Sequence, residues 1–405
     1  MDIKNLHLEN IGPFKIADLE FTPITEGEDK PIIIITGENG TGKSIIIDAI
    51  RSLFLGITDD IERDITAENN FKIIADLEID HSTSINLMSN GKNTNGKIDT
   101  NNYEFNKLFS SHSQSKYEGQ FVINYWSSKL SHDKFNISHI ETPVTKNFLH
   151  HSLSGIHTNV EVTKLITFFD YLSDSKDKSE KLIGVKMYDL IKKIIESSIH
   201  EGHLSHISRT KLQPIISINN REISLDKLSS GNLYLIQRLI HLLKQMYACS
   251  IINNIPINDI QLISGLLLID EAENHLHPKW QKTFLKSLNS LFPNLQIIVT
   301  THSPFIVSSV ENARIYVCKS ETDFSIVVEE TDFYSNKPVE EILLSPLFNT
   351  SNFNVEISEL LSKRKDAIQE KNAEEIKRIE SLLLNKNPEY FNYLNIEEIL
   401  KTIKK

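Results

Sequence analysis

The sequence predicts an α/β fold in which parallel strands deliver polar motifs to one edge of a sheet. Three apolar runs support this prediction: Pro31–Thr36, Gly265–Ile269 and Gln296–Thr301. Unbroken apolar runs of this length are typical of strands that are buried on both faces. Polar or glycine residues follow each run at once, so we expect the functional groups at the carboxyl ends of these strands.

The composition is that of a globular protein with room for a large core. The 405 residues are 40% apolar and 24% charged, and this length predicts two or three structural units. The cysteines, Cys249 and Cys318, are too few for a disulfide framework or a zinc site, which fits a reducing cytoplasm. No basic-then-apolar leader opens the chain, and no apolar run approaches the ~20 residues that span a bilayer. We therefore expect a cytoplasmic protein without a membrane segment.

The net charge of −11 works against nonspecific binding of nucleic acid. Such binding depends on Lys and Arg side chains that displace the counterions of the phosphates. A local basic patch is compatible with this total, so contact with DNA is disfavoured by charge but left open.

A glycine-rich loop follows the first apolar run. Gly37–Ser44 reads GENGTGKS and fits GxxxxGK[ST] at every fixed position, while Ser44–Ile50 reads as the helix that follows. In this motif backbone N–H groups cradle phosphates, Lys43 reaches the β- and γ-phosphates, and the Ser44 hydroxyl binds Mg²⁺. A chance match is the alternative, and the strand and helix on either side favour the phosphate site. The residues expected to bind nucleotide are Gly37, Glu38, Asn39, Gly40, Thr41, Gly42, Lys43, Ser44 and Ile45.

The other two apolar runs end in titratable side chains. Asp270 and Glu271 follow the second run; the first acid would bind Mg²⁺ and the second would polarise an attacking water. His302 follows the third run, where it could hydrogen-bond the γ-phosphate or that water. The alternatives are surface carboxylates at the end of a core strand and a purely structural histidine. We assign catalytic roles to Glu271, His302 and Lys43, and metal-binding roles to Ser44 and Asp270.

A serine-rich segment, Leu228-Ser229-Ser230-Gly231, precedes apolar residues at helical spacing over Asn232–Ile240. The segment is therefore placed at the start of a helix. A simple serine N-cap is its alternative interpretation.

These four motifs, in this order, resemble the ABC-type ATPases of the SMC/RecF/OLD-nuclease group. The opening Ile3–Phe14 also resembles the first strand and turn of that group, and the matches cover roughly residues 1–80 and 225–320. The resemblance implies a P-loop NTPase of ABC type, with an N-terminal β subdomain, a helical insertion and a helical C-terminal tail. It implies ATP and Mg²⁺ as ligands. It also implies a homodimer or higher oligomer, in which Ser229, Ser230 and Gly231 of one copy contact the γ-phosphate held by another.

Within that group the chain most resembles PtuA, the ATPase subunit of Septu-type and retron-associated antiphage systems. The resemblance rests on Asp270–Gln281, Phe292–Gln296 and Thr300–Pro304. Members of that family work beside a separate HNH nuclease, which makes such an effector the expected partner. Asn232 departs from the pattern, because many ABC signatures carry Gln or Glu there. The Q-loop glutamine has only Gln114 and Gln120 as candidates.

The remaining patterns suggest a division into 1–87 (ATPase lobe with the P-loop), 88–224 (insertion, first loops and then helices), 225–334 (signature, Walker B and His-switch lobe) and 335–405 (helical tail). In the tail we expect two amphipathic helices broken near Asn372. Two histidine groups, one at residues 150, 151 and 157 and one at residues 200, 203 and 206, could suggest a metal site. No Cys or carboxylate constellation accompanies them, and we interpret them as solvated loop histidines.

The sequence thus favours an ATP-binding and ATP-hydrolysing protein that gates or senses for a separate effector nuclease in prokaryotic antiphage defence. Two alternatives remain: a non-hydrolysing, ATP-bound scaffold for a nuclease, and a RecF-like DNA-repair ATPase. Glu271 and His302 favour hydrolysis over the scaffold. The acidic charge and the absence of sustained heptads disfavour the repair role.

Overall fold

The chain forms two compact units, Met1–Val339 and Glu340–Lys405. The computed structural model describes residues 1–23, 30–55, 65–66, 70–80, 83–92, 98–110, 115–129, 133–199, 201–348 and 353–395.

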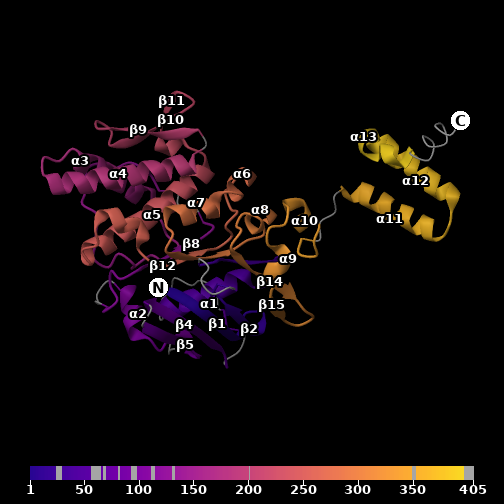
Figure 1. The fold of residues 1–405 in the computed structure, drawn as a ribbon, viewed down its shortest axis with the longest axis horizontal. Coiled ribbons are helices and arrows are strands. Elements are labelled where there is room, and N and C mark those ends of the chain that lie inside the picture. Colours follow the sequence, from indigo (N-terminus) through magenta and orange to yellow (C-terminus); the bar gives the residue numbers. More distant parts are fainter. Residues whose placement is uncertain are drawn as a thin grey trace. The chain divides into compact units, whose positions relative to one another are not determined.

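A ten-stranded sheet forms the centre of the larger unit (Figure 1). Its strands follow in the order β5 (Thr83–Ser89), β4 (Lys72–Asp80), β1 (Asp2–Ile11), β2 (Phe14–Glu20), β15 (Ser325–Glu329), β14 (Ala313–Ser320), β3 (Ile32–Gly37), β13 (Leu295–Thr300), β12 (Gly265–Ile269) and β8 (Val122–Trp126).

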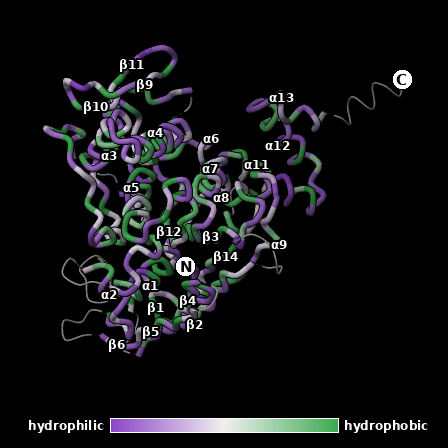
Figure 2. Tube along the Cα trace, turned by 60° about the vertical axis from the view of Figure 1, so that its left-hand side comes forward, coloured by the Kyte–Doolittle hydropathy of each residue, from purple (hydrophilic) through white to green (hydrophobic). Residues whose placement is uncertain are grey.

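One half of this sheet, from β14 to β8, is parallel. Every residue of β3, β12 and β13 is buried, as the unbroken apolar runs predict for strands covered on both faces. Figure 2 shows apolar residues concentrated along this part of the sheet. Because β3, β13 and β12 are neighbours and run the same way, the loops after them meet at one edge. The prediction of parallel strands that carry the motifs is confirmed.

The other half, formed by β5, β4, β1 and β2, is antiparallel. Strands β1 and β2 form a hairpin whose last pair is Ile11 and Phe14, with Gly12 and Pro13 at the turn. Strand β2 then meets β15 through Phe14 and Ser325, which joins the two halves. This half is the N-terminal β-rich part that the sequence predicts.

Helices cover the sheet and extend from it. They are α1 (Lys43–Leu55), α2 (Tyr103–Leu108), α3 (Asn159–Ser173), α4 (Lys178–Ser198), α5 (Ser230–Ile252), α6 (Pro278–Gln281), α7 (Phe284–Leu291), α8 (Pro304–Val307) and α9 (Thr331–Tyr334), with 3₁₀ turns at Leu225–Lys227 and Ile257–Leu262. Helix α1 joins a hydrophobic cluster with strands of both halves, through residues such as Leu6, Ile33 and Ile46. Helices α3, α4 and α5 contact one another on the other side of the unit from β1, β4 and β5 (Figure 1). None of the described helices is long and apolar enough to cross a membrane.

The predicted insertion, residues 88–224, contains strands as well as the expected loops and helices. Helices α3 and α4 confirm the helical patterns, but the strand β8 within 88–224 belongs to the central sheet, beside β12. A small sheet of β9 (Gly202–Ser208), β10 (Gln213–Ile218) and β11 (Arg221–Ser224) follows α4, and β6 (Gly91–Lys92) pairs with β7 (Ile98–Asp99). The apolar run of β8 was not recognised as a strand of the central sheet, because its place beside β12 depends on a pairing across more than a hundred residues. The four-part division of the chain itself stays a prediction.

The interpretation of the histidines as solvated loop residues is wrong for three of them. His203 and His206 lie on β9, and His157 is only 3% exposed. Burial of His157 is tolerated because its Nε2 donates to Asn124 Oδ1 (3.1 Å) and its Nδ1 accepts from Arg238, partners that local spacing does not reveal. His200 lies outside the described residues. Among the described side chains, no group of three or more His, Cys, Asp or Glu is placed to hold a metal ion.

The smaller unit contains α11 (Val355–Gln369), α12 (Ala373–Lys386), α13 (Pro388–Phe391) and a 3₁₀ turn at Asn392–Asn395; α10 (Val339–Leu343) begins at the boundary. Its core is built on Ile379, Leu383 and Phe391. Asn372 is the N-cap of α12 and accepts from Glu375 N at 3.2 Å. The prediction of two helices broken near Asn372 is confirmed.

The contact between α3 and α4 depends on Gly184. A Cβ atom at this position would lie 2.3 Å from the backbone nitrogen of Ser173. We expect Gly184→Ala to lower the free energy of unfolding by about 1–3 kcal/mol, the usual cost of overpacking. Urea denaturation would measure this change, with Lys186→Ala on the exposed face of α4 as the control. Equal effects of the two substitutions would contradict the close contact.

Candidate functional site

The carboxyl ends of β3, β12 and β13 bring three of the predicted motifs to one edge of the sheet. The glycine-rich loop follows β3, Asp270 and Glu271 follow β12, and His302 follows β13 by one residue. The backbone nitrogen of Thr301 donates to Ile35 O at 3.0 Å, which fixes the His302 segment against the strand that carries the loop. The functional roles of the site residues remain predictions.

The backbone of the loop requires its glycines. Gly37, Gly40 and Gly42 have φ values of 141°, 82° and 101°, a region that residues with a Cβ atom rarely adopt. A Cβ atom on Gly37 would lie 2.2 Å from Cys318 O, whereas one on Gly40 would have nothing within 4 Å. The loop is thus tightly held at its start and open at Gly40, a cradle that suits the close approach of a phosphate.

The Lys43 side chain folds back onto the start of this loop. Its Nζ donates to Glu38 O (2.7 Å) and Gly37 O (3.1 Å). The side chain is buried, and this burial lowers the pKa of the Lys43 ammonium, although nearby Cys318 and acidic groups act in the opposite direction. A buried cation held by carbonyl oxygens is well placed to gain from an anionic ligand.

Asp270, which follows β12, forms hydrogen bonds with residues of α1 and β13. Its Oδ1 accepts hydrogen bonds from Ser44 Oγ and Thr300 Oγ1, both at 2.7 Å. A carboxylate next to a hydroxyl is an oxygen donor set of the kind that Mg²⁺ prefers. The residues predicted to bind the metal therefore fit it: two chain segments 226 residues apart place their oxygens side by side.

The turn after β12 holds Glu271 in a strained conformation. Its φ is 54°, in the left-handed region that is uncommon for non-glycine residues and that Glu201, Leu212 and Lys371 of this chain also occupy. The backbone nitrogen of Glu271 donates to Thr300 Oγ1 at 2.8 Å, and Asn274 Nδ2 donates to the Glu271 carboxylate. Thr300 therefore positions Asp270 and Glu271 together.

Glu273 positions the histidine. Its two carboxylate oxygens accept from His302 N (2.7 Å) and Thr301 Oγ1 (2.6 Å). Burial and the Lys43 charge lower the pKa of the His302 imidazole, against the opposing effect of Glu273 and Glu271. His302 is therefore neutral at pH 7 and can act as donor and acceptor at once.

The signature segment starts α5, as predicted. Ser229 is the N-cap and its Oγ accepts from Asn232 N at 3.4 Å, while Ser229 and Ser230 are exposed. A Cβ atom on Gly231 would lie 2.1 Å from His275 O, so this glycine packs against the turn that follows Glu271. Within the part of the chain that the structure describes, no hydrogen bond joins Ser229, Ser230 or Gly231 to the glycine-rich loop.

A second connection ties α5 to that turn. The Arg238 guanidinium donates to the carbonyl oxygens of Lys129 (2.6 Å) and Ser127 (3.1 Å), and His275 Nε2 contacts Ser128 O at 2.9 Å. The signature helix and the turn after β12 are therefore both anchored on the segment 127–129.

Sequence reasoning missed four of these positioning residues: Thr300, Glu273, Asn274 and Arg238. Thr300, Glu273 and Asn274 lie inside the runs that carry the family resemblance, and their place beside the predicted acids was the available signal. Arg238 had none, because its partners are over 80 residues away. The Q-loop glutamine remains unassigned: Gln120 Nε2 donates to Lys116 O within its own turn (3.1 Å), and Gln114 lies outside the described residues.

This fold and this arrangement of motifs define a P-loop NTPase of ABC type. The chain belongs to the family described as "AAA domain, putative AbiEii toxin, Type IV TA system", which matches residues 32–308. The family supports an ATP-binding P-loop ATPase.

Curated relatives confirm the resemblance to the defence ATPases. The chain is similar to a "Retron Vc95 probable ATPase" of Vibrio cholerae, with 23% identity over 77% of this chain and 73% of the relative. It is also similar to a "Septu protein PtuA" of Bacillus thuringiensis, with 26% identity over 81% of this chain and 78% of the relative. Among solved structures, the SMC head domain from Thermotoga maritima is 16% identical with a TM-score of 0.45, over 82% of this chain and 99% of that one. Similarity at that level indicates nothing about ligands or partners.

The protonation of His302 can be tested directly. We expect its pKa to lie below 6.5, and Lys43→Met to raise it, because that substitution removes one of the two causes of the shift. Histidine-selective NMR between pH 5 and 8 would measure both values, with His302→Gln to assign the signal. The lowered pKa also means that the contribution of His302 to stability is complete above pH ~6.5 and declines as the pH falls. A pKa above 6.5 would show that the neighbouring carboxylates outweigh burial and Lys43.

Proposed function

We propose that the chain binds ATP with Mg²⁺ at this edge of the sheet and hydrolyses it. The observation that carries the proposal is the Asp270 carboxylate, which gathers the Ser44 and Thr300 hydroxyls beside a loop shaped for phosphates. Ser44 and Asp270 would hold Mg²⁺, and the ion would neutralise charge on the phosphates. Gly37 to Ile45 would bind the β- and γ-phosphates through backbone N–H groups, with Lys43 as the cation.

In this proposal Glu271 orients and polarises the attacking water, and neutral His302 hydrogen-bonds the γ-phosphate or the same water. The place of Glu271 next to Asp270, and the bond from its backbone nitrogen to Thr300 Oγ1, support this role. The bond from Asn274 engages one oxygen of the Glu271 carboxylate and orients it, and the carboxylate keeps acceptor sites for a water.

We further propose that Ser229, Ser230 and Gly231 of a second copy complete the site. The exposed hydroxyls at the N-terminus of α5, and the lack of a bond to the loop of the same chain, support a role in trans. Backbone N–H groups at a helix start favour an anion such as the γ-phosphate. Association costs roughly 4–15 kcal/mol in lost freedom, and an ATP shared by two surfaces would help to offset it.

The effector is proposed from the relatives. The names of these relatives, a retron ATPase and a Septu protein, support a role in antiphage defence. We propose that ATP-dependent assembly controls a separate effector, with an HNH nuclease as the partner to test. The helices α11 and α12 are a candidate docking surface, because most of their side chains are not buried.

A non-hydrolysing scaffold is the second candidate, because Asn232 stands where many ABC signatures carry Gln or Glu. A RecF-like repair role has less support, because the net charge of −11 disfavours binding to DNA.

Glu271→Gln separates hydrolysis from binding. We expect single-turnover hydrolysis in the wild type and a loss of at least about 100-fold in the variant, because an amide cannot accept the proton. Mass photometry with ATP should show the variant accumulating as an ATP-held assembly. Exposed Glu356→Gln in the smaller unit is a matched control. ATP binding without hydrolysis by the wild type would favour the scaffold instead.

A mixing experiment tests whether the signature acts in trans. Lys43→Ala disables the loop and Ser230→Arg blocks the signature, so each variant alone should be inactive. In an equimolar mixture, half of the dimers contain both variants, and each of these has one intact composite site. We therefore expect about a quarter of the wild-type rate in the mixture. No recovery would show that the two motifs act within one chain.

A further inference from the structure

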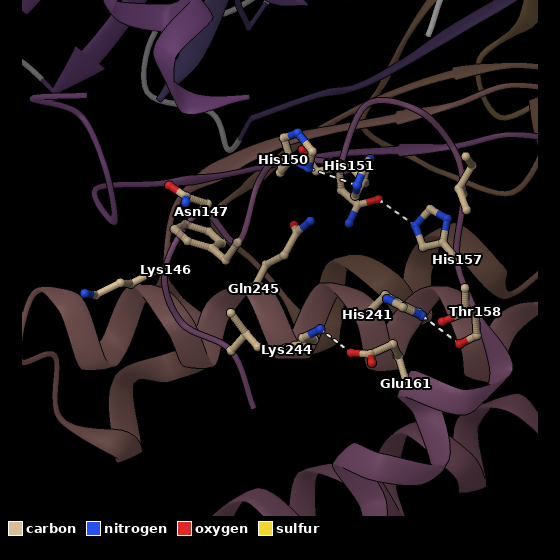
Figure 3. Close-up of a pocket in the computed structure, with 15 residues that line it drawn as sticks. Lys146, Asn147, His150, His151, His157, Thr158, Glu161, His241, Lys244 and Gln245 are labelled. Carbon is tan, nitrogen blue, oxygen red and sulfur yellow. Dashed lines mark hydrogen bonds and ion pairs between the residues drawn. The ribbon is translucent and has the colours of Figure 1, made fainter. Parts of the chain in front are cut away.

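A cavity of about 490 Å³ lies beside β8 and α5, away from the site described above. Its wall is built from β8, the turns after residue 143, the start of α3 and the middle of α5 (Figure 3). None of its lining residues belongs to the glycine-rich loop, to the turn after β12 or to the His302 segment. Its volume falls within the ~300–1,000 Å³ of small-molecule sites.

Three polar atoms of this wall are buried without a hydrogen-bond partner. They are Asn124 Nδ2, Ser152 Oγ and Gln245 Oε1, on residues that are 0%, 5% and 6% exposed. Buried polar groups are nearly always paired, so three unpaired groups around one cavity call for a partner that occupies it. Figure 3 shows the Gln245 carboxamide projecting from α5 among the other lining side chains.

The charged side chains of the cavity wall favour an anion near Lys146. Lys146 and Lys244 contribute cations, and Glu161 is an acid of the lining that pairs with Lys244. Burial lowers the pKa of His241 to about 4 and the pKa of His157 well below its usual value, so both imidazoles are neutral at pH 7. Lys244 is paired with Glu161, whereas the exposed Lys146 has no carboxylate partner among the ion pairs of the described residues. Lys146 is therefore the cation of the lining that an anionic ligand can meet.

Flat rings complete the lining. His150 and His151 lie with their ring centroids 4.0 Å apart, and Phe148 belongs to the same wall. Imidazole and phenyl rings are surfaces on which nucleobases stack. A Gln carboxamide presents a donor and an acceptor side by side, which matches the hydrogen-bonding edge of a base, and Asn124 adds its Nδ2 as a donor because its Oδ1 already accepts from His157.

We propose that this cavity binds a nucleoside 5′-phosphate, with Asn124 and Gln245 pairing with the base and Lys146 attracting the phosphate. The source can be a free mononucleotide or the end of a single strand, because both present the same chemistry. The site is distinct from the proposed ATP site and extends beyond the proposed function. Its occupant would contact β8, the neighbour of β12, and α5, the helix that begins with the signature.

The test uses full-length Lys43→Ala protein, in which the glycine-rich loop lacks its lysine. Isothermal titration calorimetry would measure the binding of AMP, GMP, CMP and UMP, of inorganic phosphate, and of a 5′-phosphorylated single-stranded DNA ten-mer. We expect at least one nucleotide probe to bind. In the same background, Gln245→Leu and Lys146→Gln should each weaken that binding at least about tenfold. Exposed Lys186→Gln on α4 is the matched control and should leave it unchanged.

Gln245→Leu replaces a buried side chain whose Oε1 is unpaired by an apolar side chain of similar size, so we expect the variant to fold, which thermal unfolding would verify. Mononucleotide binding that needs Gln245 supports the proposal and identifies a free nucleotide. Binding of the ten-mer alone, with the same dependence, supports it with a strand end as the source. Equally tight binding of inorganic phosphate, insensitivity to both substitutions, or no binding of any probe at millimolar concentration would overturn it. Because the loop is disabled throughout, these outcomes do not depend on the proposed ATPase activity.

Discussion

The candidate site depends on one buried carboxylate, that of Asp270, which is 3% exposed. A buried charge is costly unless hydrogen bonds compensate it, and here the Ser44 and Thr300 hydroxyls do so. Those two bonds join the helix after the glycine-rich loop to the strand before His302. Since Thr300 also accepts from the backbone of Glu271, the same junction sets the position of the proposed base. A shift of register between β12 and β13 would therefore disturb every part of the site at once.

The signature segment is held as firmly as the site, but by different means. Gly231 lies against His275 O, and Arg238 and His275 both bond the segment after β8. The buried Arg238 guanidinium is surrounded by carbonyl oxygens, which compensate its charge without a carboxylate. The signature segment, which we propose to meet a second copy, and the turn that carries Glu271 are thus packed together. This linkage gives a physical route by which assembly could change the environment of Glu271.

The strand β8 places a cavity beside the parallel half of the sheet. It extends the parallel half of the sheet past β12 and supplies Asn124 to the cavity wall, while α5 supplies Gln245 to the same wall. His157 bonds both Asn124 and Arg238, so the floor of the cavity and the anchor of the signature helix share a side chain. The cavity and the candidate ATP site are separate, yet they rest on the same helix and on neighbouring strands.

The sequence by itself determined the α/β fold, the parallel strands with their motifs, the helix start at Ser229 and the two helices of the tail. These features are encoded locally, in apolar periodicity and fixed spacing, so a single stretch of chain suffices to reveal them. Only the tertiary structure decided that Thr300 links Asp270 to Glu271, that β8 lies beside β12 and that His157 is buried. The partners in those three contacts are 30, more than a hundred and up to 81 residues apart, and no local pattern records such pairings.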